Sequence, residues 1–208
     1  MNLNELKAKY GNAEVMVVPS FTILKFPKNC FVKVAGDYAT NGITRRMIDD
    51  ILIKQRPMLR CDAEINPNYK QIIPYVIIYR DNKVFCTKRL KGDERLVGQI
   101  SVGTGGHLER DEQAVQGMFS ELKEEVGLEY NAANEYRFEG ILLDESTEVS
   151  SVHMGLVFSL HLAEGDIAVK EVDKLQGMWL TPGEITACNN IESWSKLCIP
   201  LVKELCNG

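Results

Sequence analysis

The chain has 208 residues, of which 45% are hydrophobic and 25% charged, as in a soluble globular protein with a substantial core. The net charge of −5 argues against a broadly basic surface, so we expect no nucleic-acid partner. No apolar run approaches the roughly eighteen residues of a membrane span, and the polar N-terminus lacks a secretory signal, which predicts a cytoplasmic protein without a membrane partner. The six cysteines lack CxxC spacing and are expected to stay reduced.

The first seventy residues contain three short apolar stretches and one amphipathic segment. Extended structure is expected at 13–18, 21–26 and 31–34. Helical spacing of apolar residues predicts a helix over 41–56, capped by Asn41 or Thr44 and ended by Pro57. Residues 60–70 are expected to form a loop. We divide the chain here, into residues 1–70 and residues 71–208.

The second part is richer in strand signals. Residues 75–80 and 83–89 predict a hairpin around the turn Asp81-Asn82. A short strand at 99–102 leads into a glycine-rich turn, and the strongest helix of the chain is expected at 112–126. Strands at 136–144, 152–162 and 178–180, a helical turn from Thr181 and a helix at 191–205, kinked or divided by Pro200, complete the pattern. This order predicts an α/β (α+β) fold, a sandwich with a mixed sheet flanked by helices.

Three carboxylates lie on one side of the helix predicted at 112–126. At about 100° per residue, Glu121, Glu124 and Glu125 share an arc of roughly 100° beside an apolar face. Carboxylates at this spacing repel one another, whereas Mg²⁺ prefers such oxygen ligands. We therefore expect a metal site on this helix. Gly127 is expected to cap the helix in a left-handed conformation, and Gly117 indicates that a neighbouring group packs closely there.

The spacing of these residues resembles the Nudix box, the signature of a family of diphosphate hydrolases. The matching positions are Gly106, Glu112, Glu121, Leu122, Glu124, Glu125, Gly127 and Leu128. Six of these positions are glycines or glutamates at fixed spacing, and such a set arises by chance in on the order of 10⁻⁴ of chains of this length. One position departs from the family pattern, because Ser120 stands where the box has Arg. Serine cannot replace the charge of a guanidinium, although Arg110, Lys88 or Arg89 could compensate.

The resemblance implies a Nudix-like α/β/α sandwich over roughly residues 74–184 and hydrolysis of a nucleoside diphosphate derivative or related phosphoanhydride. It implies Mg²⁺ or Mn²⁺ held by Glu121, Glu124 and Glu125, with Glu121 or Glu124 as the general base. Gly105 and Gly106 would bring backbone close to a phosphate or the metal, and Glu112 would lie nearby. Residues 1–70 would form an extension that sets specificity or builds a homodimer.

Further residues are candidates for secondary roles. Glu145 and Glu148 lie where a later-loop acid could serve as the base, and His107 could contact a phosphate. A phosphate clamp could come from Lys88, Arg89, Lys91 and Arg95. His153, His161, Trp179 and Trp194 are interpreted as structural.

Two other functions fit parts of the sequence. A non-catalytic Nudix module that binds a nucleotide or a protein would be consistent with Ser120. Isopentenyl-diphosphate isomerisation also uses a Nudix-like fold, and it needs an active-site cysteine and histidine metal ligands. Cys86 lies in a predicted strand before the box, but the three histidines of the chain do not form a convincing set.

Overall fold

The computed structural model describes residues 2–34, 44–91 and 97–207, which fall into two compact units that are interleaved in sequence. The first unit comprises Met1–Pro74, His107–Gly117 and Glu139–Leu156, and the second comprises Tyr75–Gly106, Met118–Phe138 and Val157–Gly208. Four elements contribute residues to both: β4 (Tyr69–Arg80), α4 (Ala114–Val126), β8 (Glu135–Leu143) and β9 (His153–His161). The division predicted near residue 70 stays a prediction.

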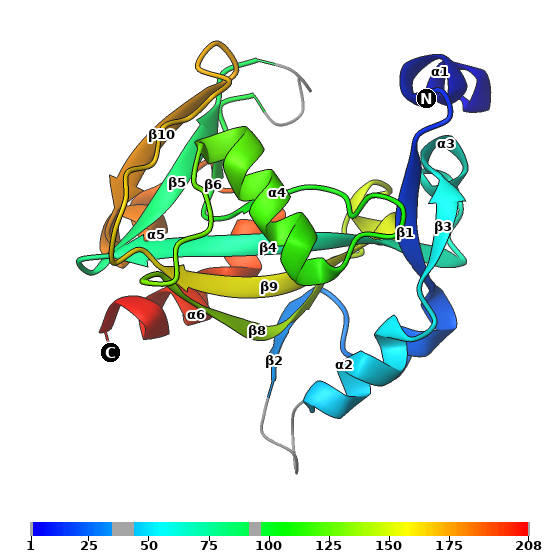
Figure 1. Cartoon of the computed structure of the whole chain (residues 1–208), viewed down its shortest axis with the longest axis horizontal. Helices are drawn as coiled ribbons and strands as arrows, with labels where there is room; N and C mark the ends of the chain where they lie inside the picture. Colours follow the sequence, from blue (N-terminus) through cyan, green and yellow to red (C-terminus); the bar gives the residue numbers. More distant parts are fainter. Residues whose placement is uncertain (1, 35–43, 92–96, 208) are drawn as a thin grey trace. The chain divides into compact units, whose positions relative to one another are not determined.

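The first unit is built on antiparallel strand pairs. Its elements are α1 (Leu3–Tyr10), β1 (Glu14–Pro19), η1 (Ser20–Ile23), β2 (Cys30–Lys33), α2 (Arg45–Leu52), β3 (Arg56–Leu59), α3 (Arg60–Ala63) and η2 (Ser150–Val152). Strand β1 pairs with β3 on one side and with the first residues of β4 on the other, and β2 pairs with β8 (Figure 1). Val15, Val17 and Ala63 form a small core cluster that Met58 and Tyr69 cover.

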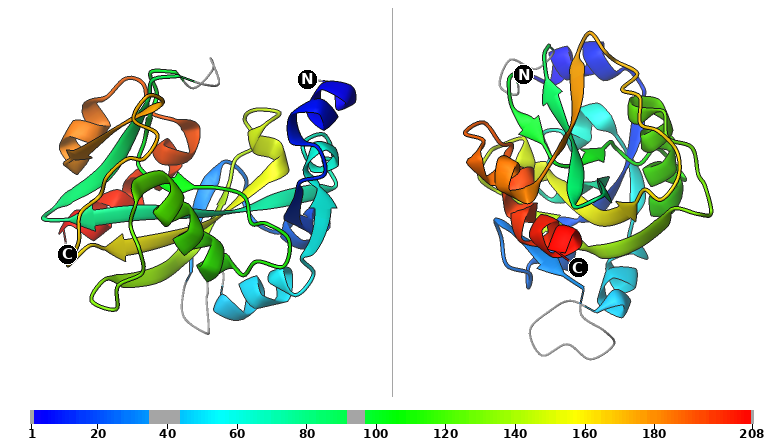
Figure 2. Two further views of the ribbon diagram at one scale, coloured as in Figure 1. Left: turned by 45° about the horizontal axis from the view of Figure 1, so that its top comes forward. Right: turned by 90° about the vertical axis from the view of Figure 1, so that its left-hand side faces the viewer.

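The second unit contains the predicted hairpin. Its further elements are β5 (Lys83–Arg89), β6 (Ile100–Ser101), β7 (Thr104–Gly105), β10 (Leu175–Leu180), α5 (Pro182–Ala187) and α6 (Ser193–Asn207). Asp81 and Asn82 both have positive φ, 51° and 59°, as a two-residue type I′ turn requires. Strand β5 continues the hairpin by pairing with β6 and β10, and α6 contacts β5 and β6 (Figure 2).

The strands are hydrogen-bonded in the order β10-β5-β4-β9-β8-β2. Strands and helices together confirm the predicted class, a mixed sheet accompanied by helices. Among the described residues, no helix combines the length and apolar character needed to cross a membrane.

Several features of the helices agree with the sequence analysis. Thr44 caps α2, because its Oγ1 accepts a hydrogen bond from Met47 N at 3.2 Å. Gly127 ends α4 with a φ of 65°. Gly117 is required by close packing, because a Cβ at this position would overlap the side chain of Leu108, which is fully buried. Asn41 lies outside the described residues.

The polar N-terminus, for which no helix or strand was predicted, forms α1, because Asn2 and Glu5 make a reciprocal capping box that pattern analysis of apolar residues does not detect. Three local predictions in the first seventy residues were wrong. The stretch 21–26 contains a 3₁₀ turn rather than a strand, and 60–70 contains α3 and the start of β4. Pro57 pairs within β3 and does not end α2, which already stops at Leu52.

Two helix predictions in the second part also need correction. Helix α4 begins at Ala114 rather than residue 112, and it follows a turn in which Asp111 adopts a left-handed conformation with a φ of 64°. Of the two alternatives predicted for Pro200, a kink or a division of the last helix, division is wrong, because the helix is continuous over Ser193–Asn207. The predicted helix boundary at Val126 is confirmed.

Candidate active site

The carboxylate of Glu121 lies against the backbone of Gly106 in the second unit. Met118 and Leu122 are fully buried and orient α4, while the pairing of Tyr75 with Gly105 holds the end of the glycine-rich turn. A Cβ at position 106 would overlap both carboxylate oxygens of Glu121. The glycine is therefore required here by close approach, and the two ends of the box meet in space.

Glu125 is a half-buried carboxylate whose environment favours the protonated form. Burial is the main cause that raises its pKa to about 7, and the charges of Glu171, Glu192 and Glu124 act in the same direction. The guanidinium of Arg89 acts against them. An extended segment runs along the end of α4, where Lys170 N donates to Glu125 O at 2.9 Å. A cation bound here would stabilise the ionised form of Glu125.

Glu192 is a second carboxylate of this kind that the sequence analysis missed. It precedes α6 and is held at β6, because its N–H donates to Ile100 O at 3.0 Å. Burial raises its pKa, while a hydrogen bond with Ser101 and the charge of Arg89 lower it. No motif marks Glu192, since tertiary packing alone brings it to this place.

Arg89 is the basic residue whose charge acts on both of these carboxylates. Its Nε is buried and has no hydrogen-bond partner in the described part of the chain. A buried donor without a partner is costly, so a carboxylate or phosphate oxygen at this position would be favoured.

The outer side of α4 carries the remaining box residues. Glu124 and Ser120 are both exposed, and Lys123 pairs instead with Glu129, 3.0 Å between Nζ and Oε1. Thus the charge of Lys123 is directed to Glu129, away from the three box carboxylates.

Glu112 belongs to the first unit. Its Oε2 accepts a hydrogen bond from Glu109 N at 3.1 Å, and its carboxylate lies beside Gly117. This geometry closes the turn that precedes α4. A role for Glu112 at a metal stays a prediction.

The later-loop acids differ from one another in their surroundings. Glu145 accepts from Lys28 at 2.5 Å and from Lys70 at 3.1 Å, and the hydrogen bond from Lys28 is the first cause that lowers its pKa. A carboxylate held in this way is a weak base. Glu148 is exposed.

The basic candidates are dispersed. Arg110 forms an ion pair with Glu14 at 2.6 Å, Lys91 is exposed, and Arg95 lies outside the described residues. Of the proposed replacements for the box arginine, Arg89 has a charge that lowers the pKa of the box residue Glu125.

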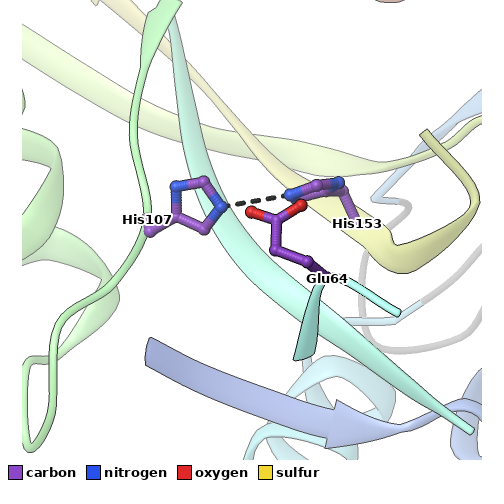
Figure 3. Close-up of side chains that lie close together, drawn as sticks. All are labelled: Glu64, His107 and His153. Carbon is purple, nitrogen blue, oxygen red and sulfur yellow. Dashed lines mark hydrogen bonds between the residues drawn. The ribbon is translucent and has the colours of Figure 1, made fainter. Parts of the chain in front are cut away.

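Two of the three histidines lie together, which the sequence analysis did not foresee. Nε2 of His107 is 3.1 Å from Nε2 of His153, and burial is the main cause that lowers the pKa of His107 to about 2. Glu64 lies beside both rings (Figure 3). His161 instead packs against Tyr79, with ring centroids 5.2 Å apart.

The tryptophans and Cys86 are packed into the second unit. Trp179 contacts Phe85 and Arg80, and Trp194 contacts Tyr75, as a structural role predicts. Cys86 is fully buried in β5, and burial raises the pKa of its thiol to about 12. A thiol in this environment does not favour the isomerase alternative.

Solved structures similar to this fold include Nudix proteins. The chain superposes on Tm1382, a protein assigned to the Nudix hydrolases, with a TM-score of 0.74 and 27% identity over 92% of this chain and 99% of Tm1382. The MutT Nudix hydrolase of Burkholderia pseudomallei matches with a TM-score of 0.53 and 17% identity over 63% of this chain and 96% of its own. No family model matches the sequence. With the box residues of Gly106 to Leu128, these similarities show that the chain has the fold of the Nudix (MutT-like) hydrolases and is similar to them in sequence.

Two curated proteins are similar to the chain in sequence, and one of them is named as a Nudix hydrolase. Protein YmaB of Bacillus subtilis is 29% identical over 206 residues, covering 91% of this chain and 97% of YmaB. The Nudix hydrolase YfcD of Escherichia coli is 27% identical over 117 residues, covering 54% of this chain and 60% of YfcD. The similarity to YmaB thus extends well beyond the box.

Proposed function

We propose that the protein hydrolyses a diphosphate linkage in a nucleoside diphosphate derivative or related phosphoanhydride, with the help of a divalent metal. The observation that carries this proposal is the contact of the Glu121 carboxylate with the Gly106 backbone. That contact joins the glycine-rich turn, where a phosphate oxygen can approach backbone N–H groups, to the helix that carries the acidic ligands.

The residues of α4 suit Mg²⁺ or Mn²⁺. Both ions prefer carboxylate oxygens, and Glu121, Glu124 and Glu125 offer them within about one turn of α4. The raised pKa of Glu125 indicates an excess of negative charge around it, which a cation would relieve. A structural relative of low identity, a bifunctional NMN adenylyltransferase/ADP ribose pyrophosphatase of Francisella tularensis, was crystallised with AMP and a manganese ion.

A bound ion would polarise the phosphoryl group and lower the pKa of a water molecule. The chain's own residues would orient the reactants around it. Gly105 and Gly106 would admit a phosphate oxygen to the backbone, and Glu121 or Glu124 would accept the proton of the attacking water. Of these two, Glu124 is the exposed carboxylate, open to solvent on the outer side of α4.

Arg89 would take the place of the arginine that the box lacks. Its charge already lowers the pKa of Glu125, and its Nε is buried with no hydrogen-bond partner among the described residues. In this role the guanidinium would orient the glutamates, as the missing arginine at position 120 does in the family. Arg89→Met would therefore reduce turnover, and the added Ser120→Arg would restore part of it.

The test is a phosphate-release screen over many diphosphate compounds with Mg²⁺ or Mn²⁺. We expect turnover of at least one nucleoside diphosphate derivative and its loss in Glu121→Gln and Glu125→Gln. Glu129→Gln, an exposed acid after the helix, is the matched control and keeps full activity. Full activity in both box variants would contradict the proposal.

A second candidate is a binding module without turnover, which Ser120 favours. In that case the same compounds would bind with measurable heat and remain intact. Turnover that appears only after Ser120→Arg would support this reading, whereas turnover by the natural sequence would exclude it.

A further inference from the structure

A compact group of three potential metal ligands lies in the first unit, apart from the box glutamates. Figure 3 shows the carboxylate of Glu64 directed toward the space between the rings of His107 and His153. One ligand atom of each residue lies within 4.8 Å of the other two. The three residues come from the end of α3, the segment after β7 and the first position of β9.

The spacing of these atoms suits a small transition-metal ion. A tetrahedral Zn²⁺ with ligands about 2.0–2.1 Å away holds its donor atoms about 3.3 Å apart. The two histidine Nε2 atoms are 3.1 Å apart, so an ion can contact both with little movement of the rings. Glu64 is half-buried, and rotation of its side chain can bring an oxygen to the third position.

The ring of His153 is oriented by a partner behind it. Its Nδ1 lies 2.7 Å from the carbonyl oxygen of Val149, which can only accept a hydrogen bond. Nδ1 therefore carries the proton, and Nε2 of the neutral ring presents its lone pair to His107. A ligating histidine fixed through its other nitrogen is the usual arrangement in metal sites.

Proton binding at this place is disfavoured. Burial is the first cause that lowers the pKa of both histidines, and the charge of Arg60 acts in the same direction on both. Burial therefore favours the neutral form of both rings, which is the form that binds metal. Arg60 also lies 3.4 Å from a Glu64 oxygen, so this ion pair would loosen when the carboxylate turns to an ion.

We propose that His107, His153 and Glu64 bind a zinc-class divalent ion, with one position left for water or an anionic oxygen. Two imidazoles and one carboxylate select Zn²⁺ or Co²⁺ over Mg²⁺, since Mg²⁺ prefers an all-oxygen shell. Three protein ligands with an open position are typical of reactive zinc sites rather than structural ones. This ion is additional to the one proposed for α4.

The test is a titration of the chelator-treated full chain with Co²⁺, followed by its visible ligand-field absorption. We expect saturable absorption from nitrogen ligation that Zn²⁺ displaces and excess Mg²⁺ does not. His107→Gln and His153→Gln each weaken Co²⁺ binding at least about tenfold. Removing a residue that only hydrogen-bonds to a metal ligand already costs about tenfold in affinity, and these changes remove a ligand itself. Glu64→Gln keeps the shape of the side chain and removes only its charge.

Two controls test whether the Co²⁺ absorption comes from this site rather than from another histidine or from the glutamates of α4. His161→Gln changes the third histidine of the chain and leaves the absorption intact. A double change, Glu121→Gln with Glu125→Gln, abolishes the proposed hydrolysis but also leaves the absorption intact. The proposal fails if the unaltered chain shows no such absorption, or if His153→Gln and Glu64→Gln retain it at full strength.

Discussion

The side chain of Glu121 occupies the space in which any residue other than glycine at position 106 would carry its β-carbon. The atoms that would be displaced are the carboxylate group, the far end of a flexible side chain, rather than backbone. A methyl group at position 106 would therefore move the carboxylate without unfolding the protein.

Gly106→Ala tests this contact. We expect kcat/KM for the best diphosphate substrate to fall at least about tenfold, or about 1.4 kcal/mol of barrier, with an unfolding midpoint close to that of the parent. Gly183→Ala is the matched control, because the nearest atom to its added methyl is 3.9 Å away. Unchanged kinetics in Gly106→Ala would show that the contact has no part in turnover.

Glu125 predicts how stability depends on pH in the absence of metal. Its folded pKa is about 7, above the ordinary value of 4.5, so the folded state binds the proton more tightly. Ionisation therefore costs stability, and the free energy of unfolding falls as pH rises from about 4.5 to about 7, by on the order of 3 kcal/mol. Urea unfolding in EDTA measures this directly.

Glu125→Gln removes the loss of stability that ionisation of Glu125 causes. The variant is expected to be more stable than the parent at pH 8 and about equal to it at pH 4.5. Mg²⁺ at pH 8 should raise the stability of the parent more than that of the variant. Parallel pH profiles for the two proteins would contradict this account of Glu125.

Gly117→Ala sets helix propensity against packing. Alanine gains about 1 kcal/mol over glycine inside a helix, but the new methyl overlaps the fully buried Leu108, and overpacking costs about 1–3 kcal/mol. We expect a net loss of stability in thermal unfolding. Leu108→Ala removes the overlapping side chain, so Gly117→Ala added to that variant should raise its thermal stability. A rise in the stability of the single variant Gly117→Ala would show that Leu108 moves freely.

Glu145→Gln distinguishes a structural acid from a catalytic base. The change leaves the Lys70 ammonium, with only 5% of its side chain exposed, without its carboxylate, which we expect to cost about 2 kcal/mol of stability. Turnover per folded molecule should persist. Glu148→Gln, an exposed acid of the same loop, serves as the control for both measurements, and loss of turnover without loss of stability would identify Glu145 as the base.

Turns and helix caps could be predicted from the sequence where they depend on neighbouring residues alone. The Asp81-Asn82 turn, the Thr44 cap and the Gly127 cap were predicted because each depends on neighbouring residues alone. The capping box of Asn2 and Glu5 follows the same rules and was overlooked because no apolar periodicity accompanies it. The helix starts two residues later than predicted, after Asp111, whose left-handed backbone conformation is not evident from the sequence.

Only some residues of the candidate sites could be predicted from the sequence. The box spacing led directly to Gly106 and Glu121, because both belong to one continuous motif. Glu192 and the pairing of His107 with His153 depend on segments that are distant in sequence, so no local pattern reports them. Arg89 was one of several basic residues in a run, and only its burial beside two carboxylates separates it from the others.

The natural cysteines can report partial unfolding through their reaction with a thiol reagent. Cys61 is buried in the first unit and Cys86 and Cys198 in the second, while Cys30 and Cys188 are partly exposed. Under native conditions a thiol reagent will modify the partly exposed pair first. Mass spectrometry of the slower modifications then times the opening of each compact unit separately, without any engineered label.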